Sequence, residues 1–118
     1  MVKYYKEVTI SGIPNEETLE DIITSTETFK YKVNRIIFTE TTATLNNDAQ
    51  LRVYLEREKI LDMNVVHTLT NITTNSRVPD PWFDLDLEIP VGQTLSVGFV
   101  SGSTASNFKI AIEYEIVE

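Results

Sequence analysis

The 118-residue chain has the length of one domain (1–118), and its 42% hydrophobic and 24% charged residues are ordinary for a globular protein. Its net charge of −8 repels phosphate backbones, so we expect no nucleic-acid partner. The absence of cysteine excludes disulfides, thiol catalysis and zinc sites built from Cys ligands.

The first segments show a period of two, which is typical of strands. Residues 4–10 place Tyr4 and Ile10 on one face and Tyr5 on the other. Residues 14–24 are less clear, because Pro14 followed by two glutamates resembles a helix start. Their β-branched content favours a strand, with a helix as the alternative.

Residues 29–39, FKYKVNRIIFT, form the clearest strand, with Phe29, Tyr31 and Val33 sharing one face. The alternation then breaks, which predicts a β-bulge near residues 34–35 or burial of both faces beyond them. Residues 51–55 and 60–66 predict a hairpin with a charged turn, and Tyr54 faces outward by this period.

The stretch FDLDLEIPVGQTLSVGF, residues 83–99, predicts two more strands. Pro90 and Gly92 fit positions i+1 and i+3 of a type I turn between them. Residues 108–117 alternate again as the last strand and predict five buried side chains: Phe108, Ile110, Ile112, Tyr114 and Ile116.

The chain shows a succession of predicted strands and no clearly predicted helix, which indicates an all-β protein. We expect a two-sheet jelly-roll β-sandwich of about eight antiparallel strands, with little or no helix. An immunoglobulin-type sandwich is disfavoured, because such domains usually bury a Trp between two cysteines. This chain has no Cys, and its Trp82 follows a proline-rich loop.

The stretches TFKYKVNRIIFTET, LRVYLEREKILDM, FDLDLEIPVGQTLSVGFVSGS and FKIAIEYEIVE resemble small single jelly-roll structural proteins of viruses. These are the capsid, decoration, turret or spike components of icosahedral DNA viruses and phages. The resemblance covers most of residues 25–118 and carries no catalytic residues with it. It implies a protein that assembles or presents a surface, located in the virion after synthesis in the host cytoplasm. No signal peptide or membrane-spanning stretch is expected.

Asp84, Asp86 and Glu88 form a row of acids on one face of the strand that begins at residue 83. Neighbours in this row lie about 6.8 Å apart, too far to share a small cation tightly. Asp80, Asp84 and Asp86 are therefore weak candidates for calcium ligands. A solvated face, or an edge protected from pairing by charge, is the favoured reading, and no metal or cofactor is expected.

The candidate contact residues are aromatic or basic. Trp82 and Phe83 follow the proline-rich loop, and Trp82 is expected to plug one end of the sandwich, with an interface or a sugar platform as alternatives. Tyr5 and Tyr54 face outward and are candidates for an interface. Lys30 and Lys32 form a basic stripe that either balances local acids or meets the acidic face of a neighbouring copy.

No catalytic motif is present. His67 is the only histidine, and neither a G-x-S-x-G elbow nor a glycine-rich phosphate loop occurs. Glu113 and Glu115 share the outer face of the last strand, but nothing in the sequence indicates a cleft around them. The chain is therefore not expected to be an enzyme.

The leading hypothesis is a non-enzymatic virion structural protein that self-associates and displays its long loops, residues 40–50, 67–83 and 101–107. Its partners would be identical copies or other virion proteins. The alternative is a carbohydrate-binding or receptor-binding β-sandwich, with a glycan or a host receptor as partner and Trp82 in the site. Neither hypothesis involves nucleic acid or insertion into a membrane.

Overall fold

The computed structural model describes residues 2–41, 48–65 and 82–117, which form eight strands. In chain order these are β1 (Tyr4–Ser11), β2 (Glu17–Thr24), β3 (Lys30–Glu40), β4 (Gln50–Leu55), β5 (Glu58–Asn64), β6 (Phe83–Ile89), β7 (Thr94–Val100) and β8 (Asn107–Val117).

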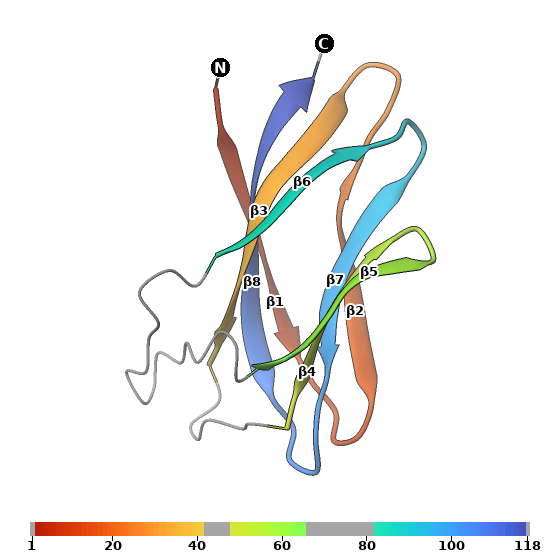
Figure 1. Cartoon of the computed structure of the whole chain (residues 1–118). Helices are drawn as coiled ribbons and strands as arrows, with labels where there is room; N and C mark the ends of the chain where they lie inside the picture. The colour runs from red at the N-terminus through yellow and green to blue at the C-terminus, as the bar shows by residue number, and fades with distance from the viewer. Residues whose placement is uncertain (1, 42–47, 66–81, 118) are drawn as a thin grey trace.

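The strands build two four-stranded antiparallel sheets, one with the order β1-β8-β3-β6 and the other with the order β2-β7-β4-β5 (Figure 1). The hairpin of β4 and β5 lies at the middle of the succession, and β3 pairs with β6, β2 with β7 and β1 with β8 around it. This nesting of pairs is the jelly-roll arrangement of eight strands in two sheets. The predicted all-β sandwich is confirmed.

The core lies between the sheets and is formed by the inward positions of the alternating strands. Leu51 and Val53 of β4, and Leu95, Val97 and Phe99 of β7, are fully buried, as their period predicted. Phe99 packs against Phe108 of β8, with ring centroids 4.6 Å apart. A close-packed apolar core of this kind is the main favourable contribution to the stability of the sandwich.

Residues 17–24 are strand, not helix. Pro14 belongs to a turn closed by the Glu16 amide, which donates to the Ile13 carbonyl at 3.1 Å. Asn15 holds the third position of this turn with φ of 61°, a left-handed conformation that Asn tolerates. The residues that resemble a helix start therefore form a tight turn of type II pattern.

The predicted bulge in the third strand is confirmed. Val33 lies opposite Tyr114 of β8 and Arg35 lies opposite Glu113, so Asn34 is an extra residue in β3. On its other side β3 meets a second bulge, in β6, where Asp86 has φ of 46°. The two bulges stand side by side across the sheet, and bulges of this kind increase the local twist.

The turn after β6 differs from the expected type I turn. Gln93 donates its amide to the Pro90 carbonyl at 3.0 Å, so Pro90 is the first residue of the turn and Gly92 the third. Gly92 has φ of 84°, the conformation that a type II turn requires at its third residue. The predicted turn was therefore displaced by one residue from the observed one. The positive φ explains why a glycine stands at position 92.

Candidate functional site

The outer face of the β1-β8-β3-β6 sheet carries a buried carboxylate. Glu113 of β8 lies between Tyr5 of β1 and Arg35 of β3 in the strand register, and its side chain is only 2% exposed. A carboxylate on an outer face is normally solvated, so neighbouring side chains must cover it. We call Lys3, Tyr5, Arg35, Trp82 and Glu113 the Glu113 cluster.

Three donors satisfy the Glu113 carboxylate. Arg35 donates from Nε at 2.9 Å and from Nη2 at 2.8 Å, both to Oε2, and Tyr5 donates its hydroxyl to the same oxygen at 3.1 Å. Lys3 Nζ lies 3.2 Å from Oε1. Burial by itself would raise the pKa of Glu113, but the hydrogen bonds from Arg35, Lys3 and Tyr5 outweigh it and hold the pKa below its ordinary value.

Trp82 completes the cluster and does not plug the end of the sandwich. The Arg35 guanidinium carbon lies 4.6 Å from the centroid of the Trp82 ring, a cation–π contact. The Tyr5 ring meets Trp82 edge-on at 6.5 Å. Both partners project from the outer face of the sheet, so Trp82 lies over that face just before β6 begins. Phe83 points the other way and packs against the core residue Phe38 at 6.3 Å.

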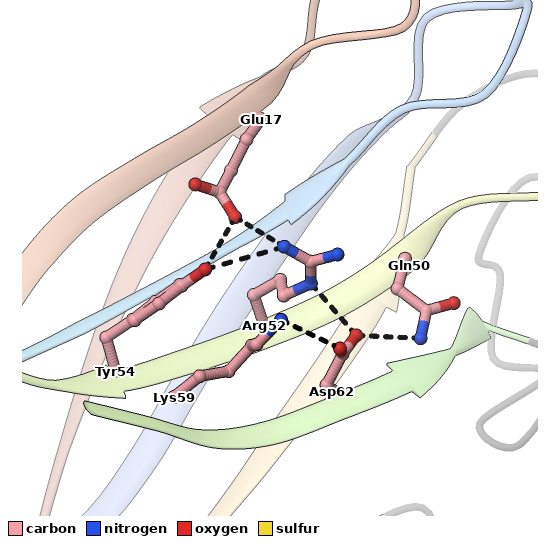
Figure 2. Close-up of polar contacts among 6 residues, drawn as sticks. All are labelled: Glu17, Gln50, Arg52, Tyr54, Lys59 and Asp62. Atoms are coloured by element: carbon pink, nitrogen blue, oxygen red, sulfur yellow. Dashed lines mark hydrogen bonds and ion pairs between the residues drawn. The ribbon is translucent and has the colours of Figure 1, made fainter. Parts of the chain in front are cut away.

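The outer face of the second sheet carries a separate polar network, shown in Figure 2. Arg52 of β4 donates to Asp62 of β5 at 2.9 Å and to Glu17 of β2 at 2.8 Å. Tyr54 donates its hydroxyl to the same oxygen of Glu17 at 3.0 Å. We call the six residues of this figure the Arg52 network: Glu17, Gln50, Arg52, Tyr54, Lys59 and Asp62.

The Arg52 network crosses a whole strand, because β7 lies between β2 and β4. Gly98 of β7 lies opposite Arg52 and supplies no side chain there. A Cβ at position 98 would collide with the Thr18 carbonyl and the Leu19 side chain. The glycine therefore permits close packing of β2 on β7 and leaves room for Arg52 and Glu17 to meet.

Asp62 is the most strongly perturbed carboxylate of the Arg52 network. Gln50 Nε2 donates to it at 2.8 Å and Lys59 Nζ lies 3.0 Å away. These two contacts, followed by Arg52, lower the pKa of Asp62 from 3.8 to about 2 against a smaller opposing effect of burial. The network therefore ties three strands of the sheet together through charged and polar side chains.

The acid row and the basic stripe lie on the same outer face as the Glu113 cluster. Asp84, Asp86 and Glu88 are exposed along β6, which is an edge strand. Lys32 lies between Glu88 and Glu115 in the register, with Nζ 3.9 Å from Asp86. Charges of opposite sign thus alternate within one copy, which favours local balance of the stripe. Lys30 is exposed next to it.

Among residues 2–41, 48–65 and 82–117, no group of three or more His, Cys, Asp or Glu side chains is placed to hold a metal ion. Asp84 lies opposite Arg35 in the register, and a cation neighbour disfavours a second cation at that position. The third calcium candidate, Asp80, lies outside the described residues, as do His67, residues 42–47 and residues 66–81 of the two long loops.

One end of the sandwich exposes apolar side chains that the sequence placed inside. We call this surface the apolar end and define it by five residues that are 37% to 65% exposed: Val2, Tyr4, Phe29, Val91 and Ile116. Figure 1 shows both chain termini at this end. Tyr4 of β1 and Ile116 of β8 have the inward phase of their strands, and Phe29 lies just before β3; all three are exposed.

Four aromatic rings cross the apolar end from β1 to the segment before β3. Tyr4 stacks on Tyr114 at 5.6 Å, Tyr114 meets Tyr31 edge-on at 5.5 Å, and Tyr31 stacks on Phe29 at 6.5 Å. Three adjoining hollows of about 660, 300 and 310 Å³ lie at this end, and all three include Val117 in their walls. The hollow of 660 Å³ is also lined by the charged residues Lys32, Glu88 and Glu115. The surface is therefore indented and ordered by ring packing, with charged residues at the border of its apolar side chains.

Sequence reasoning missed two features of these surfaces. The pairing of Arg52 with Asp62 depends on the two-residue turn between β4 and β5 and also on the register shift between Val53 and Tyr54, which the alternation of residues does not show. The contact of Arg52 with Glu17 needs the strand order of the sheet, which the sequence does not contain. The same is true of the Glu113 cluster, whose members come from β1, β8, β3 and the segment before β6.

In the described part of the chain, no helix has the length and apolar character needed to cross a bilayer. No protein-family model matches the chain, and no curated protein matches its sequence.

Proposed function

We propose that this protein is a non-enzymatic structural component, of the kind that builds or decorates virions, and that it works by self-association. The observation that carries the proposal is the apolar end. Five large apolar side chains are exposed there, and two of them, Tyr4 and Phe29, belong to a row of four packed aromatic rings. Monomeric soluble proteins rarely expose large contiguous apolar patches, and where such patches occur they commonly mark interaction sites.

The rest of the molecule supports a rigid building block. Both outer sheet faces are tied by ion networks, one centred on Glu113 and one on Arg52. The jelly-roll strand order agrees with the resemblance to viral structural proteins, although a fold hosts many functions and does not choose among them. A stiff sandwich with fixed faces and an exposed apolar end is suited to repeated contact between copies.

Light scattering on a sizing column over a range of protein concentrations tests the proposal. We expect a discrete oligomer in the absence of any ligand. The double substitution Phe29→Ser and Ile116→Ser should reduce its mass, because it removes two apolar contacts from the apolar end. Ile13→Ser is the matched control, since Ile13 is 55% exposed in the turn between β1 and β2, away from this surface. A monomer at every concentration would contradict self-association.

A second candidate function has one specific observation in its favour. Tyr5 is 62% exposed beside Trp82 on an open sheet face, an arrangement that suits a sugar platform or a receptor contact. The Arg35 guanidinium contacts the Trp82 ring, so a bound sugar would lie beside this cation–π pair. Trp82 is the only tryptophan, and its fluorescence should respond to a bound glycan. An unchanged signal across a panel of sugars would remove the carbohydrate reading.

A further inference from the structure

The sandwich has four edge strands, and three of them are protected against pairing with another chain. The edge strands β2, β5 and β6 each form part of a ladder whose register shifts. Each of them also carries acids, and β6 carries three. Bulges and charges are the usual means by which sheet edges avoid pairing with one another.

β1 carries the charged residues Lys6 and Glu7 but has no shift of register. Its eight residues pair with β8 without any shift of register, from Tyr4 opposite Tyr114 to Ser11 opposite Asn107. It contains neither Pro nor Gly, and six of its eight side chains are exposed. Alternate backbone N–H and C=O groups of an edge strand point away from its neighbour and are available to another strand. β1 is thus a straight, regular edge.

We propose that β1 pairs antiparallel with β1 of a second copy, across a twofold axis at Tyr5. The pairing would join two four-stranded sheets into one of eight strands, and it would cover Val2 and Tyr4 of the apolar end. This inference rests on the self-association proposed above and names the strand that mediates it. Strand addition at a sheet edge is a common mode of recognition.

The side chains of β1 select the position of the axis. With the axis at Tyr5, Lys3 lies opposite the second copy's Glu7, and Tyr4 lies opposite its Lys6. An axis at Lys6 or at Glu7 would place two like charges directly opposite each other, which is unfavourable. An axis at Val8 brings no opposite charges together. The register at Tyr5 therefore combines two ion pairs with two contacts between a lysine and an aromatic ring.

Both ionic residues remain accessible for this contact. Lys3 pairs with Glu113 but its side chain is 56% exposed, and Glu7 lies 3.6 Å from Lys109 with its side chain 53% exposed. Each therefore retains open positions for a second ionic partner. Pairing across the axis would extend the two existing contacts into short chains of alternating charge without breaking either of them.

Single-cysteine scanning reads the register directly, because the natural chain has no cysteine. In the proposed dimer, Tyr5→Cys places two Cα atoms about 4.5–5.5 Å apart, within the range of a disulfide. Thr9→Cys, on the same face of the same strand, is the matched control, because its two copies would lie roughly 27 Å apart. We expect rapid formation of a covalent dimer on mild oxidation of the Tyr5→Cys protein and none for the Thr9→Cys protein.

A charge reversal gives an independent measurement. Glu7→Lys should weaken dimerisation about tenfold, because it places a lysine opposite Lys3 on both sides of the axis. Lys109→Ala removes the internal partner of Glu7 and should leave dimerisation unchanged. Dimerisation that is as strong in the Glu7→Lys protein as in the natural protein would overturn the proposed register.

The outcomes separate this inference from the proposed function. A disulfide that forms fastest at Lys6→Cys, Glu7→Cys or Val8→Cys overturns the axis at Tyr5. Oligomers that scatter as expected but form no disulfide at any β1 position overturn β1 as the interface and leave self-association standing. A protein that is monomeric at every concentration overturns both.

Discussion

At the scale of single residues, Glu113 is the most informative position. The alternation of β8 directs its side chain to the outer face of the sheet, yet Tyr5 and Arg35 of the two neighbouring strands cover it and donate hydrogen bonds to it. A buried carboxylate is tolerated only where donors satisfy it, and here Arg35, Lys3 and Tyr5 do so. Its role follows from this geometry: it fixes the positions of the side chains that cover it, including the guanidinium on which Trp82 rests.

We expect Glu113→Gln to lower the free energy of unfolding by about 1–3 kcal/mol at pH 7, because charged hydrogen bonds in a buried position are lost. The pKa of Glu113 is depressed in the folded state, so its stabilising contribution is present above the ordinary carboxyl pKa and is lost as the pH falls through the folded value. The difference from the natural protein should therefore shrink in acid. Urea unfolding at several pH values measures it, with Glu20→Gln, on an exposed position of β2, as the control.

At the scale of elements, the alternation of apolar residues was enough to predict the strands and the bulge near Asn34. It was enough because each strand buries one face, and a slip of one residue would expose that whole face to water. The turn at Pro90 was misplaced by one residue, since its type depends on the φ of Gly92 and not on composition. The candidate sites were less predictable. Tyr5 and Arg35 contact both Trp82 and Glu113 only because β8 lies between β1 and β3.

The Arg52 network on the second sheet predicts how the stability of the protein depends on pH. The pKa of Asp62 is lowered from 3.8 to about 2 in the folded protein, so its contribution to stability is fully present above about pH 4 and is lost as the pH falls toward 2. Asp62→Asn lacks this contribution at all pH values. We expect thermal midpoints that lie below those of the natural protein at pH 5 and converge with them near pH 2.

Glu58→Gln is the matched control for this measurement, because Glu58 is exposed on the same strand and lies outside the Arg52 network. It should show nearly the same pH dependence as the natural protein. A constant difference between Asp62→Asn and the natural protein from pH 2 to pH 5 would show that Asp62 acts through packing and not through its charge.

At the scale of the whole molecule, two opposing forces would act on the proposed self-association. The net charge of −8 would drive copies apart, whereas the apolar end would draw them together. Raising the ionic strength shortens the range of the repulsion to about 8 Å at 0.15 M and leaves the apolar attraction in place. The structure therefore predicts an association that strengthens with salt.

We expect the mass-average size from light scattering to rise between 20 mM and 300 mM sodium chloride at fixed protein concentration. The double variant at Phe29 and Ile116 should show a much smaller rise, because it has lost apolar attraction that would bring copies together once salt screens their repulsion. Association that weakens with salt would indicate that ion pairs, and not apolar contacts, dominate the interface.

The contrast between one straight edge and three protected ones has a consequence for stoichiometry. An edge strand that pairs with the same strand of a second copy across a twofold axis has no unpaired side left, so association through β1 stops at the dimer. Any larger particle must then be assembled from dimers through a different surface, and the fold provides the part of the apolar end that the β1 contact leaves uncovered: Phe29, Val91 and Ile116. Such a particle contains an even number of chains, and loss of the apolar end should arrest it at the dimer.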